Sequence, residues 1–172
     1  MRVLMVSSNG GHFWQLASAW ECVRQDDVRL VSFKTPDVES WVAAHGVPID
    51  WGYHPTNRNL RNLFRNALLA RRILKEFSPD LIITTGAGIA VPFIILGKLL
   101  FRTQTMFIEV FDRVTSPTLT GRMVAPFSDW VVLQWEEQRK FYPKGVVLGG
   151  LLWSSSRLER TEDPSTVLST GS

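Results

Sequence analysis

The chain has 172 residues and a formal net charge of +3, from 19 lysines and arginines against 16 aspartates and glutamates. Its 45% hydrophobic and 20% charged residues are typical of a globular chain of about one domain and exclude a largely disordered one. The small basic excess favours a local basic face over general nucleic-acid binding, so we expect no nucleic-acid partner. A single cysteine, Cys22, excludes an internal disulfide.

The start of the chain and its longest apolar run bear on location. Residues 1–3 lead straight into an apolar segment without a signal-peptide pattern, which predicts an intracellular protein. The longest apolar run, 89–101, is interrupted by Pro92, Gly97 and Lys98 and is shorter than the ~20 residues that a bilayer requires. We therefore expect no membrane-spanning segment.

The segment 7–12, Ser-Ser-Asn-Gly-Gly-His, joins the apolar run 3–6 to the helix-like spacing of residues 13–17. A strand, glycine turn and helix start favour an anion, because the backbone approaches a ligand closely and the helix start offers free N–H groups. The residues predicted to bind phosphate are Ser8, Asn9, Gly10 and Gly11. His12 stands at the helix start, where a neutral imidazole is favoured and can act as a base. The alternative is an ordinary turn with a surface histidine.

Apolar and helix-like segments alternate along the rest of the chain, which is typical of a parallel sheet covered by helices on both faces. Further strands are predicted at 28–33, 47–51, 80–85, 103–109, 130–133 and 146–148. Helices are predicted at 35–46, 60–77 and 91–100, with a short one between 135 and 144. We expect one Rossmann-like α/β domain over residues 1–153, ligands beyond the carboxyl ends of its strands, and a disordered tail over 154–172.

The long helix predicted at 60–77 has two chemically distinct faces. The core stripe is expected at Leu60, Leu63, Ala67, Ala70, Leu74 and Phe77. The membrane-binding face is expected at Arg58, Arg61, Arg65, Leu68, Arg72 and Lys75. Apolar groups that project among cations fit an anionic membrane surface, at roughly 1 kcal/mol per cation near the lipid. A solvated charged face that includes an incidental leucine is the alternative.

A second glycine turn, with Gly86 and Gly88, precedes the apolar helix at 91–100 and is a second candidate for phosphate binding. Close packing between a strand and a helix would explain these two glycines equally well. Both interpretations stay open at this stage.

A polar cluster follows the strand predicted at 103–109, where a ligand is expected in such a sheet. It contains Glu109, Arg113 and Ser116. In this position Glu109 could orient a sugar hydroxyl, and Arg113 could pair with a phosphate. The alternative is an internal ion pair between Arg113 and Glu109 or Asp112.

Two common nucleotide-binding patterns are absent from the sequence. A dinucleotide-binding fold requires G-x-G-x-x-G after the first strand and an acidic residue after the second. The chain has Asn-Gly-Gly-His at 9–12 and Phe-Lys-Thr at 33–35, so both requirements fail. The Gly-Lys-Ser/Thr of a P-loop is also missing. We expect no cofactor and no metal.

Several motifs in this order resemble a glycosyltransferase family. They are Ser-Ser-Asn-Gly-Gly-His at 7–12, Ile-Glu at 108–109 with Arg-Val at 113–114, Ser-Pro-Thr-Leu-Thr-Gly-Arg at 116–122, Gln-Trp-Glu at 134–136 and Phe-Tyr-Pro-Lys at 141–144. From Val3 to about Gly150 the chain is similar to PssD-type oligosaccharide and exopolysaccharide biosynthesis subunits. These are bacterial relatives of the membrane-anchoring subunit of the eukaryotic enzyme that adds the second GlcNAc to dolichol-linked chitobiose.

The resemblance implies the N-terminal, acceptor-binding half of a split GT-B glycosyltransferase, with a separate small subunit that binds the UDP-sugar. The implied acceptor is a lipid-linked saccharide on polyprenyl pyrophosphate, at the cytoplasmic face of the inner membrane, where the chain would be a peripheral protein. Inverting transfer is implied, with His12 as the first choice of base and Glu109 as the second. The glycine turns and Arg113 would hold the pyrophosphate, and residues 151–153 would contact the partner.

A non-catalytic role is the competing hypothesis. In that case the chain recruits the catalytic partner to the membrane and presents the acceptor to it. The position of His12 at a helix start favours the catalytic version, whereas the helper role of the eukaryotic subunit favours the scaffold.

Overall fold

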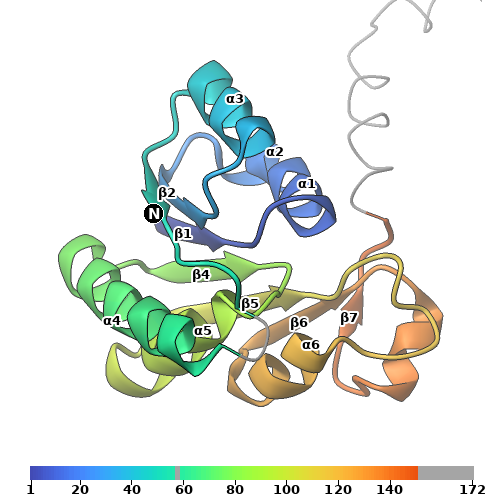
Figure 1. Cartoon of the computed structure of the whole chain (residues 1–172). Coiled ribbons are helices and arrows are strands. Elements are labelled where there is room, and N and C mark those ends of the chain that lie inside the picture. Colours follow the sequence, from blue (N-terminus) through green and yellow to red (C-terminus); the bar gives the residue numbers. More distant parts are fainter. Residues whose placement is uncertain (57–58, 151–172) are drawn as a thin grey trace, which may run out of the picture.

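The first apolar run of the chain forms β1 (Arg2–Val6), an interior strand of a parallel sheet in the order β3-β2-β1-β4-β5-β6-β7 (Figure 1). The computed structural model describes residues 1–56 and 59–150. Within this part of the chain the other strands are β2 (Asp27–Ser32), β3 (Ile49–Trp51), β4 (Leu81–Thr84), β5 (Gln104–Ile108), β6 (Trp130–Leu133) and β7 (Val146–Val147). Every neighbouring pair is parallel, which confirms the predicted α/β fold class.

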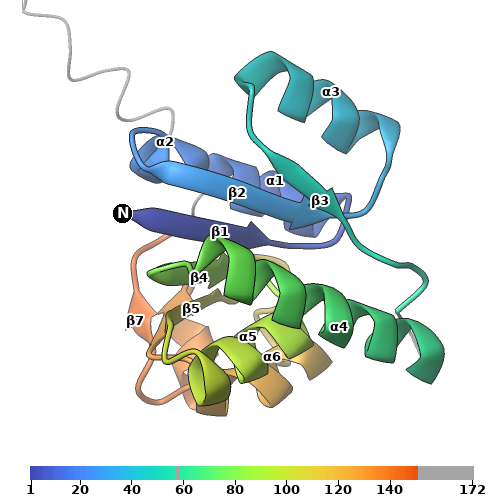
Figure 2. The ribbon, with the colours of Figure 1, turned by 90° about the vertical axis from the view of Figure 1, so that its left-hand side faces the viewer.

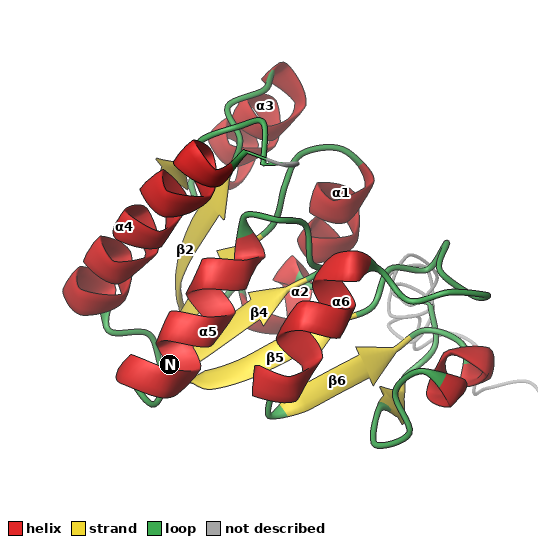
Figure 3. Cartoon of the chain, turned by 60° about the horizontal axis from the view of Figure 1, so that its bottom comes forward, coloured by secondary structure: helices red, strands yellow, loops and turns green. Residues whose placement is uncertain are grey.

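Helices cover both faces of the sheet (Figures 1 and 2). One layer contains α1 (Gly11–Ser18), α2 (Trp20–Val23) and α3 (Pro36–His45). The other contains α4 (Leu60–Phe77), α5 (Ala90–Leu100) and α6 (Leu119–Val124), with α5 between its two neighbours (Figure 3). Two short 3₁₀ helices follow, η1 (Ala125–Phe127) and η2 (Glu136–Lys140).

Alternate side chains of β1 enter the two cores, because successive residues of a strand point to opposite faces. Leu4 and Val6 pack in the core beneath α4 and α5. Val3 and Met5 pack in the core beneath α1 and α3. Since β1 pairs with both β2 and β4, all four side chains are almost fully buried. This burial on both faces explains why the first strand is a continuous apolar run.

The buried face of α4 differs from the predicted stripe. Leu60 is 80% exposed and Leu63 is 39% exposed, so neither is a core residue. The face that is buried consists of Asn62, Asn66, Leu69, Ala70, Ile73 and Leu74. The prediction assumed that only apolar residues face inward. At the start of α4, however, the inward side chains are amides that hydrogen-bond the preceding loop.

The observed strands and helices largely match those predicted from the sequence. The seven predicted strands are all present, whereas α2 and α6 were not predicted. Among residues 1–56 and 59–150, no helix combines the length and hydrophobicity needed to cross a bilayer. The expected tail at 154–172, the partner-contact segment 151–153 and Arg58 lie outside the described residues.

Candidate active site

A cavity of about 850 Å³ opens beyond the carboxyl ends of the strands. It lies where the strand order reverses between β1 and β4, the usual ligand position in an open parallel sheet. Its lining comes from six regions: Ser8, Asn9 and His12; Phe33 and Thr35; His54, Pro55, Thr56 and Leu63; Ala87, Gly88 and Val91; Arg113; and Pro117, Thr118, Leu119, Thr120 and Met123. The predicted location is therefore a real cavity.

His12 is joined to Thr85 by two hydrogen bonds. Its Nδ1 lies 2.8 Å from the carbonyl oxygen of Thr85, and the Thr85 hydroxyl donates to the carbonyl oxygen of His12 at 2.7 Å. A carbonyl oxygen only accepts, so Nδ1 carries the proton and Nε2 of the neutral ring keeps its lone pair. The pair also ties the start of α1 to the end of β4. This arrangement suits a histidine that accepts a proton through Nε2.

The two glycines of the first turn, Gly10 and Gly11, differ in backbone conformation. Gly10 has φ of 67°, which a residue with a side chain adopts only with strain. Gly11 has no such φ, and a Cβ built on it meets nothing within 4 Å. The fold therefore does not require glycine at position 11. An open backbone at a helix start is what a closely approaching ligand needs.

The carboxylate of Asp37, at the start of α3, lies beside this turn. Its pKa is lowered chiefly by the neighbouring Thr35 side chain, against an opposing effect of burial. Backbone N–H groups lower it further, including that of Gly10. The turn amide therefore already stabilises one anion, as expected of an N–H at a helix start.

The second glycine turn serves mainly local hydrogen bonding and close packing. The N–H of Gly86 donates to Thr84 Oγ1 at 2.9 Å, and Gly86 does not line the cavity. A phosphate role is therefore unsupported at Gly86. Gly88 does line the cavity, and a Cβ there would lie 2.9 Å from Thr56 Oγ1. Gly88 thus allows the loop before α4 to close over the start of α5.

That loop, residues 53–56, is held by the two buried amides of α4. Asn66 accepts from the N–H of Tyr53 at 2.9 Å and donates to its carbonyl oxygen at 2.8 Å. Asn62 donates to the carbonyl oxygen of Pro55 at 3.0 Å. The loop brings His54 to the cavity wall, with its ring 5.3 Å from that of Phe33. Sequence reasoning did not single out His54, because only the loop's tertiary anchoring places it there.

Glu109 is fully buried and does not line the cavity. Its carboxylate accepts from the hydroxyls of Tyr142 and Thr118, at 2.5 and 3.1 Å. It also accepts from the N–H groups of Thr118 and Val110. Because these donors occupy both oxygens and Glu109 does not line the cavity, the structure corrects the expectation of a second base at Glu109. Its carboxylate instead anchors the start of α6.

Three buried glutamines hold the loop that carries Arg113. Gln15 of α1 accepts from the N–H of Phe111 and from the amide of Gln134. Gln138 donates to the carbonyl oxygens of Val110 and Arg113, at 3.0 and 3.2 Å. All three glutamines are at most 3% exposed. They connect α1, the residue after β6, and η2 to one loop, a link between segments about 120 residues apart.

Arg113 itself reaches the cavity and is half exposed. Its Nε lies 3.8 Å from the Asp112 carboxylate, a loose contact between two exposed groups that contributes little. The predicted internal ion pair therefore does not occupy the guanidinium. Ser116 is exposed and does not line the cavity.

The predicted site residues thus divide into two groups. Those that line the cavity are Ser8, Asn9, His12, Gly88 and Arg113. Those that do not are Gly10, Gly11, Gly86, Glu109 and Ser116. Across the described part of the chain, no group of three or more His, Cys, Asp or Glu side chains could hold a metal ion.

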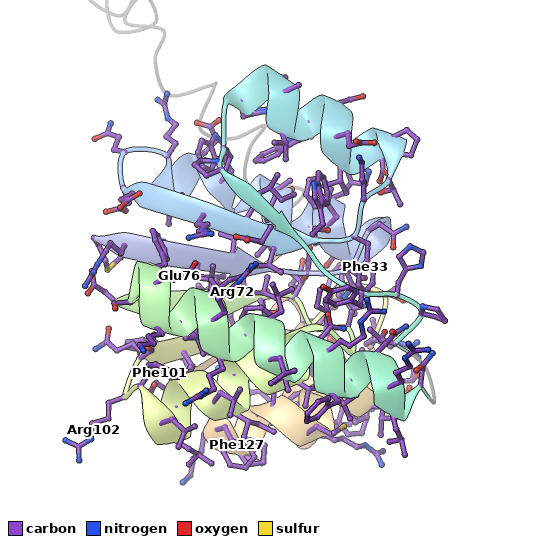
Figure 4. The ribbon with its side chains drawn as sticks, turned by 60° about the vertical axis from the view of Figure 1, so that its left-hand side comes forward. Phe33, Arg72, Glu76, Phe101, Arg102 and Phe127 are labelled. Atoms are coloured by element: carbon purple, nitrogen blue, oxygen red, sulfur yellow. The ribbon has the colours of Figure 1, made fainter. Side chains whose placement is uncertain are left out.

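The predicted membrane-binding face of α4 is largely exposed. Leu68 is 53% exposed and lies between Phe64, at 65%, and exposed arginines. Arg65 lies over the Tyr53 ring at 3.9 Å. Arg72, labelled on α4 in Figure 4, is 3.3 Å from Asp50 of β3, so part of its charge is compensated. Arg61 and Lys75 are exposed.

Comparison with protein families assigns the chain. Residues 56–151 match the model of "Oligosaccharide biosynthesis protein Alg14 like", which covers more than half of the chain. The chain belongs to the Alg14-like family. A mouse relative, UDP-N-acetylglucosamine transferase subunit ALG14, is 28% identical over 85 residues, 46% of this chain and 39% of that protein.

The Alg14-like chain is also similar to bacterial transferases. The UDP-N-acetylglucosamine--N-acetylmuramyl-(pentapeptide) pyrophosphoryl-undecaprenol N-acetylglucosamine transferase of Alkaliphilus oremlandii is 27% identical over 180 residues, 94% of this chain and 48% of that protein. The crystal structure of Acinetobacter baumannii MurG superposes with a TM-score of 0.66 at 16% identity, over 79% of this chain and 42% of that one. This likeness shows a Rossmann-like domain of the GT-B type. The matched region spans less than half of each of these three relatives.

Proposed function

We propose that this chain is the acceptor-binding, membrane-associating subunit of a two-chain glycosyltransferase. The transferred sugar comes from a UDP-sugar, and the acceptor is a saccharide linked to polyprenyl pyrophosphate. The observation that carries the proposal is the cavity lined by His12, whose Nδ1 is bound to the Thr85 carbonyl oxygen, and by the half-exposed guanidinium of Arg113. A base and a cation in one cavity suit an acceptor that has both a hydroxyl to deprotonate and a phosphate to hold.

The relatives support both the chemistry and the division into subunits. The mouse relative is described as a UDP-N-acetylglucosamine transferase subunit, and the Alkaliphilus relative as a transferase that acts on a pyrophosphoryl-undecaprenol compound. We assign the UDP-sugar to a second, smaller chain that forms the other half of a GT-B pair. The PssD-type resemblance of the motifs favours exopolysaccharide or capsule biosynthesis as the pathway.

The proposed reaction is an inverting displacement. Nε2 of His12 takes the proton of the acceptor hydroxyl. At the same time the hydroxyl oxygen forms a bond to the anomeric carbon of the UDP-sugar. The bond from that carbon to the UDP oxygen breaks, and UDP leaves with the electron pair. Thr85 fixes the imidazole tautomer through its carbonyl oxygen, and Arg113 holds the acceptor pyrophosphate.

Membrane association is assigned to the exposed face of α4. Phe64 and Leu68 project among Arg61, Arg65 and Lys75, an arrangement that fits an anionic bilayer surface. We assign the protein to the cytoplasmic face of the inner membrane, as a peripheral protein. The acceptor would then reach the cavity from the bilayer on the same side of the sheet as α4.

The decisive experiment measures sugar transfer from radiolabelled UDP-sugars to a lipid-linked acceptor, with this chain co-expressed with its partner. His12→Ala is expected to lower turnover by roughly 100-fold or more while the complex still forms. His45→Ala, on α3 and outside the cavity, is the matched control and should keep wild-type turnover. Near-normal turnover of His12→Ala would leave this chain a non-catalytic scaffold, and no transfer by the wild type would refute the assignment.

A further inference from the structure

The cavity has two chemically different halves. The polar half contains Ser8, Asn9, His12, Thr35 and Arg113. The apolar half contains Leu63, Val91, Pro117, Leu119 and Met123, and Thr118 and Thr120 line the cavity from the same segment as the last three. A cavity of this kind matches a ligand that has a charged head and a hydrocarbon tail, because each half desolvates only the part it resembles.

The apolar half is a groove that runs over the start of α5. Ala87, Gly88 and Val91 form its floor, since α5 is sunk into the core between its neighbours. Leu63 of α4 lines one side, and Leu119 and Met123 of α6 line the other. Figure 3 shows α4 and α6 on either side of α5. The apolar lining therefore comes from the face that carries these three helices.

The walls of the groove expose apolar surface that the fold does not cover. Leu119 is 76% exposed, Met123 is 44% and Leu63 is 39%. Leu119 is the first residue of α6, where a polar residue would serve the helix as well. On α4, Leu60 and Phe64 flank Leu63 at helical spacing and are also strongly exposed. Contiguous exposed apolar surface beside a polar cavity indicates a binding site.

Charge selects the head group of the ligand. Arg113 and the helix start at His12 favour an anion in the polar half. If the anion of such a ligand lies in the polar half, a hydrocarbon tail joined directly to it would lie in the groove. We propose that the groove between α4 and α6 binds the first isoprene units of the acceptor's polyprenyl chain while the pyrophosphate lies in the polar half. This inference rests on the proposed function and specifies how its acceptor is held.

Binding to the full-length chain tests the groove without any sugar transfer. The probes are farnesyl pyrophosphate and methyl pyrophosphate, which share a head group and differ in the tail, both below micelle-forming concentration. The wild type is expected to bind farnesyl pyrophosphate at least about 10-fold more tightly. Leu119→Ser with Met123→Ser should reduce that preference to less than about 3-fold and leave methyl pyrophosphate binding unchanged.

The matched control is Leu99→Ser with Leu100→Ser, at the far end of α5. These leucines are 61% and 63% exposed, so the control removes similar surface. They adjoin Phe101 and Arg102, which Figure 4 shows at the opposite end of the sheet from Phe33 of the cavity. The control should keep the full preference. Two results would refute the groove as a binding site. One is an equal loss of the farnesyl preference in the control, and the other is no farnesyl preference in the wild type.

The transfer assay separates this inference from the proposed function. A farnesyl preference that Leu119→Ser with Met123→Ser abolishes, combined with no sugar transfer by the wild-type pair, would retain the groove and refute the transferase assignment. Sugar transfer without any farnesyl preference would retain the transferase and refute the groove. Loss of both probes in the double variant would also contradict the groove, because its residues would then serve the head group.

Discussion

The Tyr142 hydroxyl donates a 2.5 Å hydrogen bond to the fully buried carboxylate of Glu109. The bond links the segment after η2 to the end of β5. The same carboxylate accepts from the Thr118 hydroxyl, which in turn caps α6 by accepting from the N–H of Gly121. The start of α6, which lines the cavity through Leu119 and Thr120, thus depends on a chain of hydrogen bonds that begins at Tyr142.

This relationship predicts a loss of stability at high pH. Burial and the hydrogen bond to Glu109 raise the pKa of Tyr142 above its ordinary value of 10.0. The folded state therefore holds this proton more tightly than the unfolded state. The resulting stability is fully present below pH 10 and declines as the pH rises above it. Tyr142→Phe is expected to flatten the decline in the free energy of unfolding between about pH 9 and pH 11.

Urea denaturation at several pH values measures this effect. The other tyrosine of the chain, Tyr53, is 38% exposed and provides the control Tyr53→Phe, which should keep the wild-type slope. At neutral pH, Tyr142→Phe is expected to cost about 2 kcal/mol, because the buried carboxylate of Glu109 loses a donor. Parallel pH curves for wild type and Tyr142→Phe would contradict the coupling.

Gly11 predicts opposite changes in stability and activity. A Cβ at this position meets nothing within 4 Å and the φ is not positive, so Gly11→Ala introduces no strain. Because alanine favours a helix over glycine, the variant should be unchanged or more stable by up to about 1 kcal/mol. A ligand that approaches the backbone closely would meet the added methyl group, so the acceptor KM should rise.

Thermal unfolding and steady-state transfer assays on Gly11→Ala check both effects. The contrasting variant is Gly10→Ala, whose φ of 67° makes it destabilising. A Gly11→Ala variant with an unchanged acceptor KM would show that no ligand approaches this turn.

Gln138 predicts a specific defect in acceptor binding. Gln138→Glu keeps the shape but turns a carboxylate oxygen towards the carbonyl oxygens of Val110 and Arg113. Two buried acceptors then lose their donor, at a cost of about 1–3 kcal/mol each. The loop should shift and misplace the Arg113 side chain. We expect the acceptor KM to rise more than kcat falls, because Arg113 is assigned to pyrophosphate binding.

Kinetic assays of the co-expressed pair, with acceptor concentration varied, measure this split. Gln25→Glu, at an exposed position after α2, is the isosteric control and should match the wild type. A fall in kcat with an unchanged acceptor KM would contradict the positioning role of Gln138.

The exposed face of α4 predicts salt-sensitive membrane binding. Arg61→Gln removes one cation from this face and should weaken binding to anionic vesicles by roughly 5-fold, equivalent to about 1 kcal/mol. The effect should shrink at high salt and vanish on vesicles without anionic lipid. Arg24→Gln, beyond α2 in the other helix layer, removes the same charge and should have no effect in vesicle sedimentation. Equal weakening by both variants would exclude a specific face.

The alternation of apolar runs, glycine turns and helix-like segments was sufficient to predict the seven strands and the α/β class. It was also sufficient to place His12 and Arg113 at the cavity, because the carboxyl ends of parallel strands share one edge of the sheet. The strands and the fold class follow from the local spacing of apolar residues. The position of the two site residues follows from the shared direction of the strands. The same reasoning misassigned α4, because Asn62 and Asn66 face inward only where the loop 53–56 supplies their partners.

Only the tertiary structure decided which polar residues face the cavity and which support it. Glu109 follows a strand just as a catalytic carboxylate would, yet Tyr142 and Thr118 surround it with donors. Gln15 and Gln138 lie far apart in sequence and meet at a single loop. No short pattern encodes such contacts, because each side chain is satisfied by groups from another part of the chain. Whether a buried polar residue has a partner is decided when distant segments pack together.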